Sequence, residues 1–199
     1  MNLSTEQINE WHREICEVTP WLYISGDLHP NRDQALAQLE LWRSTGITDI
    51  IDVRGEWTDE PLVSEAAPEI KYHYLGTHDD GTSQDSEWFK AGIEAMADAL
   101  SRPNAKLMVH CHMGINRGPS MAFAMLISQG WEPIAALGAI RAARPIAGII
   151  YADDALSAVR QFQGENLDRL PLDLEEIQNW FDENYIDIST IIRKIRSAE

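Results

Sequence analysis

The chain has 199 residues, enough for one domain with a sizeable hydrophobic core. Hydrophobic residues make up 44% of it and charged residues 24%, as is typical of a globular protein, and no apolar run approaches the roughly 20 residues of a membrane-spanning helix. The formal net charge of −16 repels nucleic acid and anionic membrane surfaces, so we expect neither as a partner.

The first half of the chain predicts helices that alternate with strands. Residues 4–17 carry Ile8, Trp11 and Ile15 at helical spacing, which favours an amphipathic helix. Further elements are expected as a strand at 21–24, a helix from about 31 to 46, strands at 47–53 and 70–75, and a helix at 86–100. A polar loop, GTHDDGTSQDSEWF, lies between the last of these strands and the last helix.

The stretch at 106–130 predicts a buried strand, a tight loop and a helix. Leu107 to Val109 form an apolar run, Pro119 suits the first turn of a helix, and Gly130 ends it. More helices are expected at 133–144 and 152–162. Two apolar stripes follow, formed by Leu174, Ile177, Trp180 and Phe181 and then by Ile188, Ile191, Ile192 and Ile195. The alternation predicts an α/β fold with a central, mainly parallel sheet flanked by helices, and extra helices at the carboxyl end.

The loop between this strand and helix combines residues that can bind and attack a phosphate. Backbone N–H groups at a helix N-terminus form an anion-binding site, and Gly114 allows the left-handed backbone that such a loop needs. Arg117 offers a planar fork of donors, and Cys111 lies where a thiolate is stabilised, with a pKa of roughly 3.5–7.5 in such settings. The alternative is a buried Cys111 and a surface Arg117 without chemistry.

The segment VHCHMGINRGPS resembles the His-Cys-x-x-Gly-x-x-Arg signature of the cysteine-dependent protein phosphatases, most closely the dual-specificity branch. The resemblance covers roughly residues 18–162 and implies a protein tyrosine phosphatase-like fold. It divides the chain into a catalytic domain with an amino-terminal helix at 1–163 and a helical extension at 164–199. Packing of this extension on the domain is the simpler expectation, and a partner-binding or dimerisation tail is the alternative.

The resemblance implies a set of site residues. Cys111 is expected to be the nucleophile and Asp79 the general acid, since Asp79 precedes the Trp88–Phe89 pair as in the family, with Asp80 as the alternative. Alternatively, the Asp-Asp-Gly sequence is only a turn without a catalytic role, because Asp and Gly are favoured in turns. The phosphate-binding loop would contain His112, Met113, Gly114, Ile115, Asn116 and Arg117, supported by His110 through hydrogen bonds and by Ser120.

One position departs from the family pattern. The family usually places Ser or Thr directly after the arginine, where the hydroxyl stabilises the departing thiolate, and this chain has Gly118 there. The difference predicts a competent enzyme with slow hydrolysis of the phosphocysteine. His73, His78 and His112 lack the spacing of a metal site, so no metal and no other cofactor is expected.

The expected substrates are phosphotyrosine and phosphoserine or phosphothreonine in proteins, with small phosphomonoesters as an alternative. The loop has no lysine, which disfavours a polyanionic lipid. A phosphate-binding module without turnover is the second hypothesis, and a sulfur-transferring rhodanese-like domain ranks last. The chain has two cysteines, too few for a disulfide framework, and a catalytic thiol needs a reducing compartment, so we expect a cytoplasmic protein.

Overall fold

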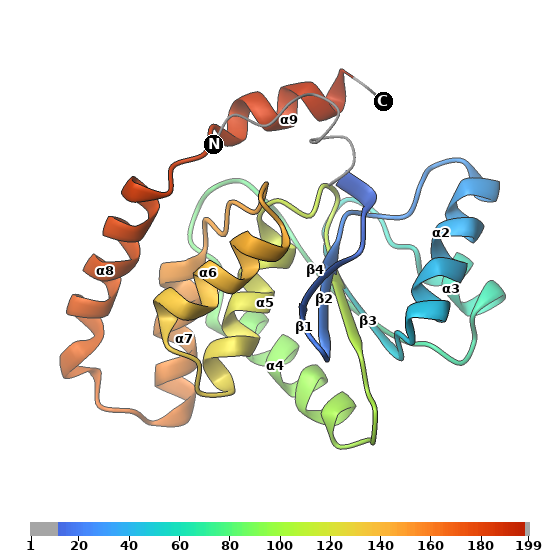
Figure 1. The fold of residues 1–199 in the computed structure, drawn as a ribbon. Coiled ribbons are helices and arrows are strands. Elements are labelled where there is room, and N and C mark those ends of the chain that lie inside the picture. Colours follow the sequence, from blue (N-terminus) through green and yellow to red (C-terminus); the bar gives the residue numbers. More distant parts are fainter. Residues whose placement is uncertain (1–11, 198–199) are drawn as a thin grey trace.

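The computed structural model describes residues 12–197, which fold around a five-stranded sheet with the strand order β1-β2-β5-β3-β4 (Figure 1). The strands are β1 (Cys16–Thr19), β2 (Leu22–Ser25), β3 (Asp49–Arg54), β4 (Lys71–Thr77) and β5 (Leu107–His110). β1 runs antiparallel to β2, and every other neighbouring pair is parallel. This arrangement confirms the predicted α/β fold with a mainly parallel sheet.

Helices cover both faces of the sheet. Their bounds are α2 (Arg32–Thr45), α3 (Glu60–Ala66), α4 (Ser86–Leu100), α5 (Arg117–Ser128), α6 (Pro133–Ala143), α7 (Ala152–Gln163), the 3₁₀ turn η1 (Leu167–Arg169), α8 (Leu170–Glu183) and α9 (Ile188–Arg196). Helices α2 and α3 lie on one face, and α4, α5, α6 and α7 lie on the other (Figure 1). No helix in 12–197 is both long and apolar enough to span a membrane.

The buried strands serve both layers because successive side chains point to opposite faces of a sheet. In the central strands, Ile50 and Met108 pack with α2 and α3, whereas Ile51 and Val109 belong to the larger cluster around α5. These strands therefore read as continuous apolar runs, as expected for a parallel sheet that is covered on both sides.

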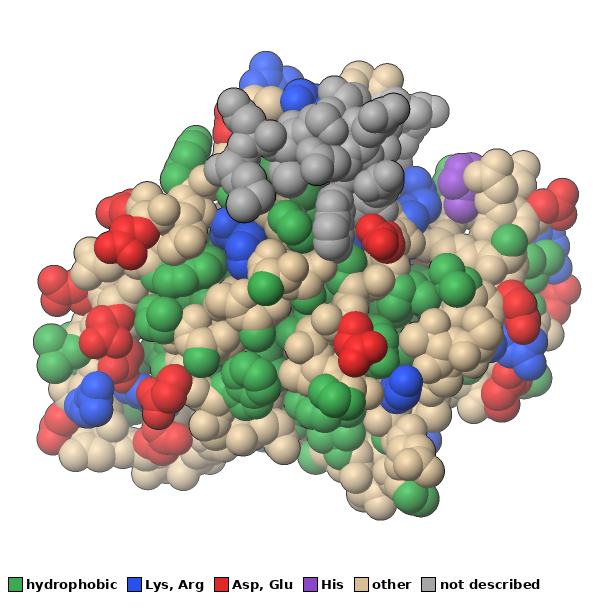
Figure 2. Space-filling model, viewed as in Figure 1, with side chains coloured by type: hydrophobic (Ala, Val, Ile, Leu, Met, Phe, Trp, Pro, Cys, Tyr) green, Lys and Arg blue, Asp and Glu red, His purple; other side chains and the backbone are tan. Residues whose placement is uncertain are grey.

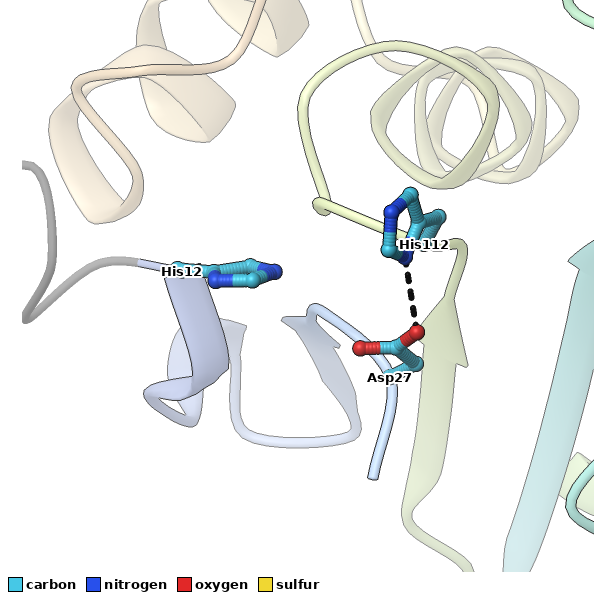
Figure 3. A group of neighbouring side chains, drawn as sticks. All are labelled: His12, Asp27 and His112. Carbon is cyan, nitrogen blue, oxygen red and sulfur yellow. Dashed lines mark hydrogen bonds and ion pairs between the residues drawn. The ribbon is translucent and has the colours of Figure 1, made fainter. Parts of the chain in front are cut away.

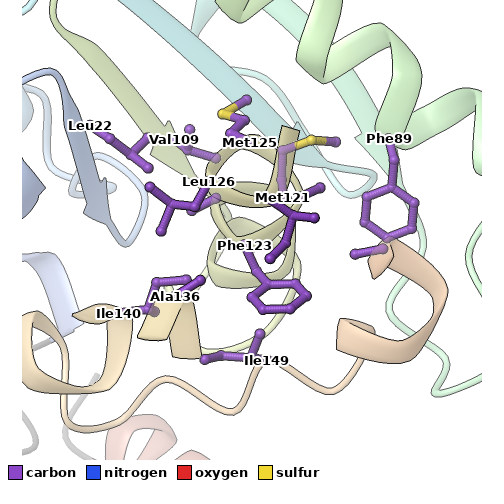
Figure 4. Packing of buried hydrophobic residues seen from close by; sticks show 14 of the residues in the cluster. Leu22, Phe89, Val109, Met121, Phe123, Met125, Leu126, Ala136, Ile140 and Ile149 are labelled. Carbon is purple, nitrogen blue, oxygen red and sulfur yellow. The ribbon is translucent and has the colours of Figure 1, made fainter. Parts of the chain in front are cut away.

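Helix α5 is the centre of the larger layer. All its side chains from Arg117 to Ile127 are buried, and Phe123 and Leu126 pack among residues of β2, β5 and α6 (Figure 4). A helix that is apolar on all sides belongs in a core. The loop before α5 is thus anchored by an element that cannot shift without disturbing the core.

The structure corrects two details of the sequence-based prediction. The carboxyl end of the helix expected at 4–17 is strand β1, which pairs with β2 across a two-residue turn, so tertiary pairing overrides the helical spacing. Residues 12–13 are helical as predicted, residues 14–15 are not, and residues 4–11 lie outside the described residues. Helix α3 was not expected, whereas α5 begins at Arg117 and so has Pro119 in its first turn, as predicted.

The last two helices pack differently. Helix α8 buries Ile177 against the larger cluster and lies along α6 and α7 (Figure 1). Helix α9 packs through Ile191 and Ile195 against Met113 and Ile115 of the loop before α5. In Figure 2, Asp and Glu side chains are scattered over the face, and Lys and Arg side chains occur at its top, where α9 is, and also on both flanks.

Candidate active site

The loop of residues 111–116 connects β5 to α5 at the carboxyl ends of the parallel strands. β5 lies between β2 and β3, and binding sites of open α/β sheets form at this edge. Because α5 begins at Arg117, the positive end of its dipole faces the loop. Gly114 has φ +61°, and a β-carbon there would collide with Arg144 and with Ser25 O, so both the expected left-handed backbone and the space require glycine.

A buried arginine from the end of α6 holds this loop in shape. Arg144 is fully buried, and its Nε donates to Gly114 O at 2.6 Å while Nη2 donates to Met113 O at 3.0 Å. Its Nη1 also contacts Cys16 Sγ at 3.3 Å. Burial raises the pKa of the Cys16 thiol, although the charge and hydrogen bond of Arg144 oppose this effect. Arg144 thus satisfies loop carbonyls that would otherwise be buried without donors.

Cys111 is buried at the base of the loop, directly beside the first turn of α5. A β-carbon on Gly118 would lie 3.6 Å from Cys111 Sγ, an ordinary van der Waals contact. The backbone at Gly118 therefore runs next to the sulfur, at the position where the family pattern carries a hydroxyl. Ser120, the other hydroxyl considered from the sequence, bonds instead to Asn116 Oδ1 and to the N–H of Tyr151, both at 3.3 Å.

Arg117 is buried, and the two terminal nitrogens of its guanidinium are hydrogen-bonded by other segments. Nη1 and Nη2 donate to the two carboxylate oxygens of Glu56, both at 2.8 Å, and Nη1 also donates to Thr77 O at 2.8 Å. Burial alone would lower the pKa of Arg117, but the Glu56 hydrogen bonds and the charges of Cys111 and Glu56 raise it. Arg117 is thus a cation held in place by Glu56 and Thr77.

The Arg117 ion pair also perturbs Glu56. Burial would raise the pKa of Glu56, but the hydrogen bonds and charge of Arg117 outweigh it and hold that pKa below its ordinary value. Such a two-pronged arginine–carboxylate pair is among the stronger charge-assisted contacts. A phosphate that binds Arg117 must therefore share the guanidinium with Glu56 or displace it.

The two aspartates that the sequence left open take different positions. Asp79 Oδ1 accepts from Asn116 Nδ2 at 2.7 Å and from the Tyr151 hydroxyl at 2.8 Å, and Asp79 Oδ2 lies 3.4 Å from Arg117 Nε. Asp80 turns to Thr82, whose N–H and hydroxyl donate to Asp80 Oδ1. Asp79 is thus fixed against the loop, whereas Asp80 caps its own exposed turn.

His110 does not order the loop by hydrogen bonds, which corrects the expectation from the sequence. The ring is fully buried, and neither nitrogen has a hydrogen-bond partner within the described residues. It packs on Trp42 with the ring centroids 5.6 Å apart, and Nε2 lies 3.9 Å from Asp52 Oδ1, beyond hydrogen-bond distance. Burial lowers the pKa of His110, even though the Asp52 charge opposes this. The ring therefore packs β5 against α2.

His112 forms a small cluster with Asp27 and His12 (Figure 3). His112 Nδ1 lies 2.8 Å from Asp27 Oδ2, and the potential ligand atoms of all three residues lie within 4.8 Å of one another. Asp27 is already compensated by two cations, because Arg13 lies 3.2 Å and Arg54 3.5 Å from its oxygens. These guanidinium groups would repel a metal ion, so the cluster is explained by a His–Asp pair.

The loop opens into a cavity of about 660 Å³. Its lining contains the loop residues Cys111, His112, Met113, Ile115, Asn116 and Arg117, the acidic residues Glu56, Asp79 and Asp80, and also Gly81, Ile150, Ile188, Ser189, Ile192 and Arg196. A thiol, a buried arginine and an acidic group thus face one space, which suits capture of a phosphate and its attack by sulfur. Helix α9 provides one wall of the same space.

Comparison with known proteins agrees with this geometry. No family model matches the sequence. Dual specificity protein phosphatase 26 from Rattus norvegicus is 33% identical over 114 residues, which are 56% of this chain and 50% of that protein. PTPMT1 in complex with PI(5)P has a TM-score of 0.61 at 14% identity, covering 75% of this chain and 97% of that chain. Human DUSP28 has a TM-score of 0.59 at 19% identity, covering 75% and 95%.

The chain has a dual-specificity phosphatase-like fold. It spans about half the length of the curated relative it matches, and the two solved structures share the fold at low sequence identity. Several contacts of this phosphatase-like site were missed by sequence reasoning. Glu56, Arg144 and Tyr151 were given no role in the site. The position of Arg144 directly before Pro145 is only a weak signal for a role in the site, because a residue before proline is expected wherever a helix ends.

Proposed function

We propose that the chain is a phosphatase that hydrolyses phosphomonoesters through a phosphocysteine intermediate. Phosphotyrosine and phosphoserine or phosphothreonine of proteins are the proposed substrates, as the names of the relatives suggest. The observation that carries the proposal is the convergence of Cys111, Arg117 and Asp79 on one cavity. We further propose that residues 1–163 form the catalytic domain, that 164–199 extend it, and that the protein works in the reducing cytoplasm.

In the first step, the phosphate enters the cradle of loop N–H groups and Arg117. The Cys111 thiolate attacks phosphorus, forming an S–P bond as the bond between phosphorus and the leaving oxygen breaks. Asp79 gives its proton to that oxygen, so an alcohol or phenol departs and not its anion. The charge that develops on the other phosphate oxygens is stabilised by the helix N-terminus and Arg117.

In the second step, water attacks the phosphocysteine. Asp79, now ionised, takes a proton from the water, the S–P bond breaks, and the thiolate leaves with its electron pair to restore the starting enzyme. The products are inorganic phosphate and the free Cys111 thiolate. In this scheme the thiolate, the acid and the arginine supply the nucleophile, the proton and the charge stabilisation, and we assign no step to a metal or cofactor.

The test is hydrolysis of a small aryl phosphate by the wild type and by Cys111→Ser, in EDTA and a reducing agent. We expect turnover by the wild type and none by Cys111→Ser, while vanadate binding by the variant confirms that its pocket is intact. Turnover that survives in Cys111→Ser would refute thiolate catalysis.

A second candidate is a phosphate-binding module that does not turn over. Two observations favour it: Gly118 leaves no hydroxyl beside Cys111 Sγ, and Glu56 already occupies both arms of the Arg117 guanidinium. Release of the alcohol or phenol product over time distinguishes the two candidates. The binding module releases none, whereas a phosphatase with a slow second step releases one equivalent in a burst.

A further inference from the structure

Helix α9 is built into the candidate active site. Ile191 and Ile195 pack against Met113 and Ile115 of the phosphate-binding loop, with Ile146 completing the cluster. This is a close fit, since a β-carbon on Gly148 would lie only 2.7 Å from Ile188 Cδ1. The adjoining face of α9, with Ile192 and Arg196, lines the cavity above Cys111, and Ile192 also packs against the same apolar cluster. The helix therefore sits where the body of a substrate must lie once its phosphate is bound.

The charges around the cavity single out Arg196. Arg117 is already engaged by Glu56 and Asp79, and the remaining acidic lining residue, Asp80, is negative. The Arg196 side chain is exposed and forms no salt bridge with any residue of 12–197. It is therefore the lining cation whose donors are available to an incoming anion.

Other basic residues of the same turn differ from Arg196. Arg193 donates to Ser189 O and to Thr190 Oγ1 of its own helix, and it does not line the cavity. A cation near a helix carboxyl end also stabilises the helix dipole, and Arg193 and Lys194 can provide that effect without Arg196. The helix thus offers a matched comparison between a basic residue at the cavity and one directed away from it.

We propose that α9 is part of the substrate site and that Arg196 binds a second anionic group of the substrate. The substrate class is a phosphomonoester whose apolar body lies along Ile192 and Ile150 and carries a carboxylate or a second phosphate toward Arg196. Arginine suits this role because its planar fork of donors matches both groups. The inference rests on the proposed phosphatase function, since the first phosphate is assumed to occupy the loop at Cys111.

The test compares phenyl phosphate with 4-carboxyphenyl phosphate, which differ by one negative charge. We expect Arg196→Gln to raise KM for the carboxylated substrate about five- to tenfold at low salt, with little change in kcat and less than twofold change for phenyl phosphate. Arg196→Lys should recover part of the loss, and Arg193→Gln should behave as the wild type. The proposal would be overturned if Arg196→Gln raised KM by the same factor for both substrates. It would also be overturned if Arg193→Gln and Arg196→Gln raised KM for 4-carboxyphenyl phosphate equally.

Binding to the Cys111→Ser variant separates this inference from the proposed function. Affinities for the two compounds can be measured by calorimetry whether or not the wild type turns over. If the wild type hydrolyses neither compound, the phosphatase proposal fails, but preference of the variant for the carboxylated compound, lost with Arg196→Gln, still supports the second anion site. Equal affinity of the Cys111→Ser variant for the two compounds would overturn the second anion site. Two phosphotyrosine peptides that differ by Asp or Asn beside the phosphorylated residue then show whether a protein or a small molecule supplies the second charge.

Discussion

The identity of the general acid gives the sharpest test of the proposed mechanism, because the chain contains its own control. Asp79 contacts Asn116, Tyr151 and Arg117, whereas Asp80 next to it accepts from Thr82 in its own turn. We compare Asp79→Asn with Asp80→Asn. In Asp79→Asn, the amide oxygen still accepts from Asn116 and Tyr151, so the loop keeps its shape while the transferable proton is lost.

The size of the effect follows from the role of the proton. A positioned general acid contributes about 10²–10⁴-fold to rate, which corresponds to about 3–5 kcal/mol of barrier. The loss should be large for phenyl phosphate, because phenolate is a poor leaving group, and much smaller for p-nitrophenyl phosphate, whose leaving group needs little help. Asp80→Asn should change either rate less than twofold, since an exposed amide oxygen can still accept from Thr82.

The assay is kcat/KM for both substrates across pH. The wild type should lose activity on the alkaline side as the acid ionises, and Asp79→Asn should lack this limb. The pKa of Asp80 is lowered by hydrogen bonds from the hydroxyl and the N–H of Thr82, which favours its ionised form and makes it a poor proton donor. The assignment of Asp79 would be refuted if Asp80→Asn instead abolished hydrolysis of phenyl phosphate. It would also be refuted if both variants lowered kcat/KM by the same factor for phenyl phosphate and for p-nitrophenyl phosphate.

Three other substitutions test parts of the site. Arg144→Met should destabilise the protein by about 2–4 kcal/mol in urea unfolding, because buried loop carbonyls lose their donors. Gly118→Ser places a hydroxyl beside Cys111 Sγ and should speed phosphocysteine hydrolysis several-fold, seen as a smaller burst in rapid-quench experiments. The pKa of Glu56 is lowered from 4.5 by Arg117, so its contribution to stability is complete above pH 4.5 and is lost as pH falls through the folded-state pKa. Glu56→Gln should therefore differ most from the wild type at pH 5 and least at pH 3.

Each of these predictions has a distinct contrary result. Arg141 is a half-buried arginine that donates to Asn184 O, and Arg141→Met should lower the free energy of unfolding less than Arg144→Met does. Equal decreases in the two variants would show that Arg144 has no special role in stability. An unchanged burst in Gly118→Ser would move the slow step away from thiolate departure. A stability difference for Glu56→Gln that stays constant between pH 5 and pH 3 would mean that the Arg117 pair is not what stabilises the folded state.

Local features of the site could be predicted because they depend on neighbouring residues. Gly114 was expected to have positive φ, and it does, because a tight loop before a helix requires it. The strand before Cys111 followed from its apolar run, and the helix with Pro119 in its first turn followed from apolar spacing. The parallel sheet followed from alternating strands and helices. Each of these depends on short stretches of chain.

The remaining contacts could not be predicted because they join segments that are far apart in the sequence. Glu56 and Tyr151 reach Arg117 and Asp79 only after β3 and α7 pack on the core. The spacing of α9 indicates an amphipathic helix but not the loop residues that its apolar face covers. The hydrogen bonds expected for His110 came from family resemblance, and here the ring packs against Trp42 instead. Packing of the whole chain decides such contacts.

The net charge of −16 and a site for anions are compatible because they act over different distances. Exposed charges are largely screened beyond about 8 Å at physiological salt, whereas the helix N-terminus and Arg117 act within contact distance of a bound phosphate. At low salt, however, the whole acidic surface should repel a doubly charged phosphate and slow its encounter. Added salt should thus raise kcat/KM for phenyl phosphate. For 4-carboxyphenyl phosphate the gain should be smaller in the wild type than in Arg196→Gln, because screening also weakens the attraction that we assign to Arg196.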